Sequence, residues 1–102
     1  MIQHVVAVSL RAAAQEDALH DIMDGLEALM PEIPGFTAFQ HGPNRDFERL
    51  SQRYSYGFVC TFTDKTALDA YASDPRHKAL GARLISLCEP GPGGIMVLDL
   101  ET

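Results

Sequence analysis

Two histidines and a tyrosine stand where the sequence pattern otherwise places apolar side chains. His4 shares the alternating positions of an apolar N-terminal segment, while Tyr71 and His77 lie on the apolar stripes of two helical segments. A histidine can act as a general base near neutral pH, and a tyrosine hydroxyl can orient a substrate oxygen. His4, Tyr71 and His77 are therefore candidate catalytic residues. The alternative is that they are core residues, each satisfied by one hydrogen bond, and the sequence leaves both interpretations open.

Three aromatic residues of a later segment point into the same space. Tyr54, Tyr56 and Phe58 occupy alternate positions of a strand pattern, on the face that should meet the helices. Ligand sites are typically apolar pockets with a few convergent polar groups. The sequence therefore predicts a small apolar ligand pocket between the helices and the sheet, lined by these rings.

The remaining polar residues do not suggest a metal or another cofactor. His4, His41 and His77 belong to different elements, and no two histidines of the chain are four residues apart on a helix. The glycine-rich stretch 91–94 lacks the lysine and the strand–loop–helix context of a phosphate-binding loop. We expect neither a metal nor a cofactor.

Two periodicities define the elements that must position these residues. Period-two or continuous apolar patterns predict four strands, over residues 2–10, 36–42, 54–62 and 95–100. Helical stripes and capping residues predict helices over residues 16–30, from residue 63 or 64 to about 72, and from Pro75 onward. The order β-α-β-β-α-β is typical of an α+β, ferredoxin-like domain with an antiparallel sheet, and the length fits one domain, residues 1–102.

Strand periodicity also predicts which side chains share a face. Phe36, Ala38 and Gln40 should lie on one face of their strand and His41 on the other. The final strand is apolar almost throughout, which favours a central position in the sheet.

One face of the predicted sheet carries small apolar residues that the helices cannot cover. Val5 and Ala7 lie on this face of the first strand, and Val59 and Thr61 on the same face of the third. A soluble monomer rarely exposes an apolar area of this kind, and two-fold dimers are the commonest homo-oligomers. We therefore expect a homodimer that pairs through this face.

Composition excludes several other partners. The formal net charge is −6, so the chain lacks the basic surface that binds nucleic acid or anionic membranes. No apolar run approaches the length of a membrane span, and the first residues resemble a strand more than a signal peptide. Cys60 and Cys88 stand among apolar neighbours, as expected for reduced, buried thiols in a cytoplasmic protein.

Four segments resemble the stress-responsive A/B barrel (Dabb) family of dimeric α+β barrels: residues 2–8, 33–35, 71–77 and 97–101. The resemblance covers about residues 2–101 and implies a dimer that pairs sheet to sheet. Some plant members are cofactor-free polyketide cyclases. By similarity, His77 would be the general base, Tyr71 its partner or oxyanion donor, and His4 a substrate-orienting group. The family often has a histidine before the proline, where this chain has Asp74, and the loop 90–94 looks longer than usual.

The family includes both catalysts and proteins without a known reaction. The resemblance therefore implies a dimeric Dabb-like protein with a small apolar pocket, or alternatively a cofactor-free polyketide cyclase, lyase or isomerase that uses His77. A heme- or quinone-handling monooxygenase, as in the wider superfamily of dimeric barrels, has only fold analogy in its favour.

Overall fold

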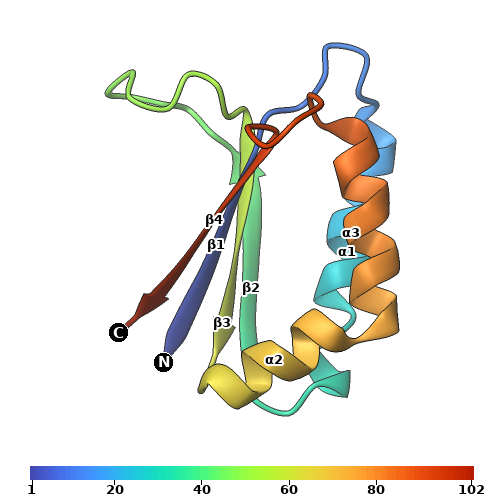
Figure 1. Cartoon of the computed structure of the whole chain (residues 1–102), viewed down its shortest axis with the longest axis vertical. Coiled ribbons are helices and arrows are strands. Elements are labelled where there is room, and N and C mark those ends of the chain that lie inside the picture. The colour runs from blue at the N-terminus through green and yellow to red at the C-terminus, as the bar shows by residue number, and fades with distance from the viewer.

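A computed structural model describes all 102 residues as a helical layer packed on one face of a four-stranded antiparallel sheet (Figure 1). The strands are β1 (Ile2–Val8), β2 (Phe36–Pro43), β3 (Tyr56–Phe62) and β4 (Ile95–Glu101). The helices are α1 (Glu16–Glu27), the short 3₁₀ helix η1 (Met30–Glu32), α2 (Lys65–Ser73) and α3 (Pro75–Leu87). The α+β, ferredoxin-like class predicted from the sequence is confirmed. No helix has both the length and the apolar character that a membrane crossing requires.

Helix α1 forms because its apolar residues recur at helical spacing and meet the sheet. Leu19, Ile22, Met23 and Leu26 are buried on one stripe, and Glu16 and Asp17 place negative charge in the first turn. The predicted helix 16–30 is too long, since α1 ends at Glu27. The chain continues into η1, where a proline at the first or second position suits a fresh helical turn.

Two aspartates begin the helices of the second half. The Asp64 side chain accepts a hydrogen bond from the Ala67 amide at 2.9 Å, and Asp74 accepts one from Arg76 at 2.8 Å. Both satisfy amides that a helix start leaves unpaired. The predicted boundary at Pro75 is confirmed. Leu84 is buried, whereas its neighbour Ile85 is 63% exposed.

The sheet order is β2-β3-β1-β4, so β4 is an edge strand. The prediction of a central position was wrong. Strand β4 carries apolar residues on both faces although it lies at an edge. Met96, Leu98 and Leu100 lie on one face and alternate with residues of the helix-facing side, such as Val97. Figure 1 shows β4 on the side of β1 away from β3, beyond the cover of α1 and α3.

A β-bulge changes the faces of β2. The register pairs Phe36 with Phe62 but Ala38 with Thr61, which leaves Thr37 as the additional residue. As a result, Phe36, Phe39 and His41 all lie on the side that faces the helices, whereas Ala38 and Gln40 lie on the other side. The predicted alternation is therefore wrong beyond Phe36.

The sheet face away from the helices is the outer face. It combines residues of the central strands β1 and β3 with residues of the edge strand β4. Val5 pairs with Val59 on one side and with Leu98 on the other, and Ala7 pairs with Met96. The side chains of Met96, Leu98 and Leu100 are 38%, 46% and 50% exposed. The four face residues predicted from the sequence, Val5, Ala7, Val59 and Thr61, share this uncovered face with the apolar residues of β4.

Candidate functional site

The fold brings the three candidate catalytic side chains together between α2, α3 and β1. The ring centroids of Tyr71 and His77 are 4.1 Å apart, and those of His4 and Tyr71 are 5.9 Å apart. Tyr71 is fully buried at the end of α2, whereas His4 and His77 are half-buried. Three residues from separate parts of the chain therefore form one polar cluster at the edge of the core.

Asp99 joins this cluster and holds the ring of His4. The pairing of β1 with β4 places Asp99 directly opposite His4, and its carboxylate lies 2.6 Å from His4 Nδ1. When Nδ1 donates its proton to the carboxylate, Nε2 of the neutral ring is an acceptor. Asp99 was not among the residues predicted from the sequence. The signal was available, because Asp99 is the only charged residue of the apolar segment 95–100.

His77 is held as a neutral imidazole. Burial lowers the pKa of His77, and the nearby His4 lowers it further, while a hydrogen-bonding contact with the Ala72 carbonyl opposes the shift. His77 Nδ1 lies 3.4 Å from that carbonyl oxygen. A proton on Nδ1 leaves Nε2 free to accept a proton, which is the state that a general base needs.

Tyr71 and Cys60 form a buried pair that stays protonated. The Cys60 thiol donates a weak hydrogen bond to the Tyr71 hydroxyl at 3.8 Å. Burial raises the pKa of Cys60 to about 12, and burial also raises the pKa of Tyr71 well above its usual value. A thiol in this environment is a poor nucleophile, so the pair contributes packing and a neutral hydroxyl.

Neither cysteine should react with a thiol reagent in the folded protein. Cys60 is fully buried, Cys88 is 5% exposed, and burial raises the pKa of Cys88 as well. Titration with Ellman's reagent at pH 8 should detect no rapidly reacting thiol in the native protein. It should detect both thiols after denaturation. Rapid reaction of a thiol in the native protein would contradict the closed packing around it.

The polar cluster is closed within the protomer. Tyr71 packs edge-on against Phe36 at a centroid distance of 5.3 Å and lies 5.1 Å from the ring of Phe62. None of the hollows in the molecule is lined by His4, Tyr71 or His77. The helix–sheet space at this end is filled by side chains, so a molecule acting on His77 must first displace some of them.

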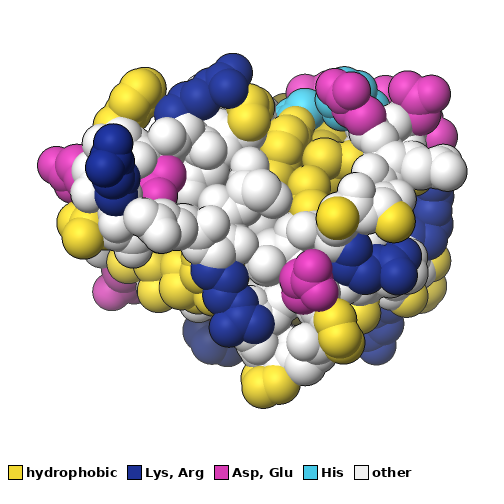
Figure 2. Space-filling model, turned by 90° about the horizontal axis from the view of Figure 1, so that it is seen from above, with side chains coloured by type: hydrophobic (Ala, Val, Ile, Leu, Met, Phe, Trp, Pro, Cys, Tyr) yellow, Lys and Arg dark blue, Asp and Glu magenta, His cyan; other side chains and the backbone are white.

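The helix–sheet space opens at its other end, beside Tyr56. This Tyr56 hollow has a volume of about 310 Å³ and lies between the start of α1 and the adjoining ends of β2 and β3. Its apolar lining comes from Leu10, Ala14, Leu19 and Pro43, together with the Tyr56 ring. Figure 2, which views this end of the molecule, shows a hydrophobic area bordered by histidine and acidic side chains.

Polar groups converge on the same hollow. The Tyr56 hydroxyl lies 2.6 Å from His41 Nδ1, a contact that exists because the bulge turns His41 toward the helices. Burial raises the pKa of Tyr56, and the charge of Glu16 raises it further, so the hydroxyl keeps its proton. Gln15 lines the hollow together with Glu16 and His20 of α1, and His41 reaches it only through the Tyr56 hydroxyl. The hollow thus offers an apolar floor and hydrogen-bonding groups at its side.

The three aromatic residues proposed for the pocket lie close together on and before β3. Tyr54, Tyr56 and Phe58 all line a second hollow of about 330 Å³, which includes Val5, Ala7, Val59 and Met96 of the outer face. Tyr56 also lines the Tyr56 hollow, Phe58 is a buried core residue of the helix-facing side, and Tyr54 precedes β3. The hollow that the three residues share is therefore the one at the outer face.

Family and structural comparisons agree with this architecture. The sequence profile of the family described as "Stress responsive A/B Barrel Domain" (Dabb) matches residues 2–102. The chain belongs to the Dabb family. No curated protein matches the chain significantly.

Solved structures extend the comparison of this Dabb chain. A dimeric ferredoxin-like protein of unknown function from Jannaschia sp. CCS1 is 50% identical, with a TM-score of 0.92, over 99% of this chain and 98% of that one. The Arabidopsis thaliana protein At3g17210 is 22% identical, with a TM-score of 0.85, over 100% and 95%. A hydroxynitrile lyase from Passiflora edulis is 14% identical, with a TM-score of 0.79, over 97% and 90%. The last two likenesses concern the fold alone.

Proposed function

We propose that this Dabb protein is a homodimer whose protomers each bind a small, largely apolar molecule in the Tyr56 hollow. The observation that carries the proposal is the hollow itself: about 310 Å³, apolar on its floor and provided with the Tyr56–His41 pair at its side. Small-molecule sites combine these two properties. The preferred ligand has an apolar body and one group that hydrogen-bonds to a phenol.

The uncovered outer face supports the dimer. Apolar residues of β1, β3 and β4 lie side by side there without a helix over them. The Jannaschia protein, which is 50% identical, is described as dimeric. A two-fold dimer buries the same face of both protomers and thereby removes the exposed apolar area.

A cofactor-free lyase, cyclase or isomerase is a second candidate function. It is favoured by the arrangement of His4, Tyr71 and His77, in which Asp99 fixes one histidine and burial keeps the other neutral. In this role His77 takes the substrate proton, Tyr71 supports the developing oxyanion and His4 orients the substrate. The Passiflora hydroxynitrile lyase shares the fold and so provides an analogy only.

The remaining parts of the proposal concern the extent of the domain and its cellular location. We propose that residues 1–102 fold as one domain, because a single core joins all helices to the sheet. Two free, buried cysteines support a location in the reducing cytoplasm.

Blocking the hollow tests the ligand proposal. Ala14 lines the Tyr56 hollow, while its neighbour Ala13 is exposed and does not line it. N-Phenyl-1-naphthylamine, a neutral apolar fluorophore, should bind the wild type saturably. Ala14→Trp should weaken this binding about tenfold or more, equivalent to about 1.4 kcal/mol, because the indole occupies the space. Ala13→Trp is the matched control and should bind as the wild type does; equal binding by both variants would refute the site.

A further inference from the structure

The loop between β2 and β3, residues 44–53, presents two large apolar side chains to solvent. Phe47 is 91% exposed and Leu50 is 83% exposed, more than any other large hydrophobic residue of the chain. Figure 1 shows that the loop extends past the end of the sheet on the side away from the helices. Isolated exposed apolar residues are common, but two of this size on one projecting loop suggest a contact surface.

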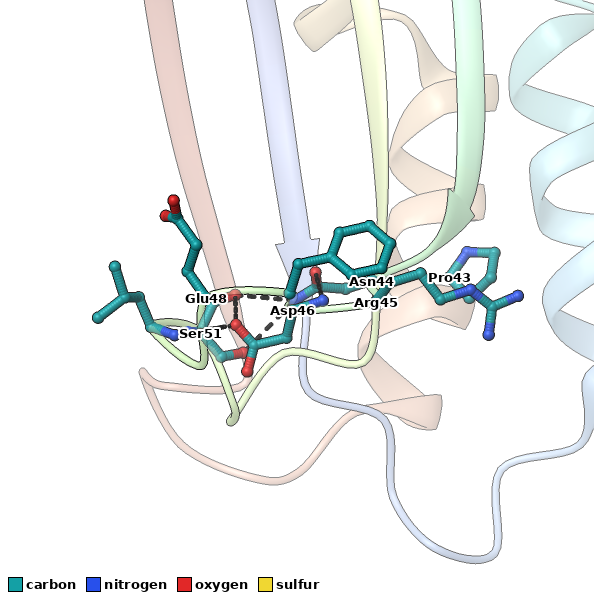
Figure 3. A pocket seen from close by; sticks show the side chains of 8 residues that line it. Pro43, Asn44, Arg45, Asp46, Glu48 and Ser51 are labelled. Carbon is teal, nitrogen blue, oxygen red and sulfur yellow. Dashed lines mark hydrogen bonds between the residues drawn. The ribbon is translucent and has the colours of Figure 1, made fainter.

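Hydrogen bonds hold this loop in one shape (Figure 3). The Asp46 carboxylate accepts from the Leu50 amide at 3.0 Å, and from the amide and hydroxyl of Ser51 at 2.9 Å each. The Asn44 amide donates to the Ser51 hydroxyl at 2.9 Å and to the Tyr54 carbonyl at 2.8 Å. The two apolar side chains are therefore held away from their own core by an ordered scaffold.

The backbone conformation shows that this scaffold carries strain. Asp46 and Arg49 have φ angles of 48° and 60°, in the left-handed region that residues other than glycine seldom adopt. Such conformations persist only where the surrounding contacts enforce them, and they concentrate at functional segments. The base of the loop is also braced from outside, because the Arg53 guanidinium lies over Gly93, where any Cβ would collide with it.

The base of the loop is continuous with the outer face. Asn44, Ser51 and Tyr54 line the same hollow of about 330 Å³ as Val5 and Val59. The loop thus borders a concave apolar surface and also carries two exposed apolar side chains, Phe47 and Leu50. A two-fold pair presents each of these surfaces once from each protomer, so the two can satisfy one another.

We infer that the 44–53 loop docks Phe47 and Leu50 onto the partner protomer, in the outer-face hollow lined by Val5, Tyr54 and Val59. The occupant is a second copy of this chain, because the receiving surface is continuous with the face through which the dimer is proposed to pair. The inference rests on that proposed dimer and adds a reciprocal contact to it. The loop contributes binding energy, and it closes the end of the interface against water.

Matched variants test the contribution of the loop. The double variant Phe47→Ser/Leu50→Ser should raise the dimer dissociation constant about tenfold or more, measured by analytical ultracentrifugation over a concentration series. Ile85→Ser is the control, since Ile85 is 63% exposed on α3, in the helical layer on the opposite side of the sheet. It should leave the constant unchanged. Circular dichroism should show native folding for both, because all three side chains are exposed.

Photo-crosslinking tests where the loop docks. Benzoylphenylalanine at position 47 should crosslink, in a mixture of isotope-labelled and unlabelled protomers, to the partner within residues 54–59 or 5–7. The same photo-reactive residue at position 85 should give no such product. A wild-type monomer at all concentrations would refute the dimer and this inference together. A wild-type dimer whose stability is unchanged in the double variant, with no crosslink between protomers from position 47, would refute the inference alone.

Discussion

Replacing Leu98 by aspartate is expected to separate the proposed dimer into folded monomers. Leu98 lies on the outer face of β4, opposite Val5, and is 46% exposed in the protomer. In the dimer, the new carboxylate would be buried against apolar side chains without a partner, which costs several kcal/mol. We expect the dissociation constant to rise at least about a hundredfold, or about 2.8 kcal/mol. Light scattering combined with size-exclusion chromatography across a dilution series measures the change.

The neighbouring residue provides the control for this prediction. Val97 is 47% exposed on the same edge strand, but it pairs with Val6 and belongs to the helix-facing side. Val97→Asp therefore introduces the same charge at the same exposure on the opposite face, and it should leave the dimer intact. If both variants dissociate equally, general weakening of β4 is the cause and the outer face is not the interface.

Truncation of Tyr71 should give the largest loss of stability in the polar cluster. Tyr71 is 1% exposed and its ring contacts those of Phe36, Phe62 and His77. Tyr71→Ala removes a buried aromatic ring and should lower the free energy of unfolding by about 3–5 kcal/mol. Tyr71→Phe keeps the ring and loses a hydroxyl whose hydrogen-bond partner is the Cys60 thiol, so it should cost about 1 kcal/mol or less. Urea denaturation measures both.

The conservative variant also separates the structural role of Tyr71 from a catalytic one. If the cluster catalyses the conversion of a β-keto substrate, Tyr71→Phe should remain folded and lose turnover, as should His77→Ala. If turnover persists in both folded variants, the cluster is not the catalytic site, and the buried rings act only in packing. Loss of 3 kcal/mol or more in Tyr71→Phe would instead contradict the assignment of its hydroxyl to one weak contact.

The sequence was enough to predict those parts of the fold that a single local signal determines. Helix starts at Asp64 and Asp74 follow from side-chain capping, and the outer-face residues of β1 and β3 follow from strict alternation. The position of β4 did not follow, because an apolar strand is compatible either with a central place or with an edge covered by a partner. Only the strand order shows that β4 lies at an edge of the sheet.

The candidate site was harder to predict from the sequence because it depends on the register in which the strands pair. The cluster of His4, Tyr71 and His77 could be anticipated from helical and strand faces, but its closure by Phe36 and Phe62 depends on side-chain volumes across three elements. Asp99 belongs to the cluster because strand pairing places it opposite His4. The open hollow lies at Tyr56 instead, where His41 arrives only because of the bulge.

That bulge means that β2 carries one residue more than its pairing with β3 uses. Removing Thr37 would leave the later pairs in place, with Ala38 opposite Thr61 and His41 opposite Phe58, because the extra residue has no partner on β3. If the complete strand instead paired without a bulge, His41 would turn away from Tyr56 and Gln40 would take its place. An alignment with a relative that lacks the bulge must therefore place its one-residue gap at Thr37, since a gap placed after His41 would compare side chains from opposite faces.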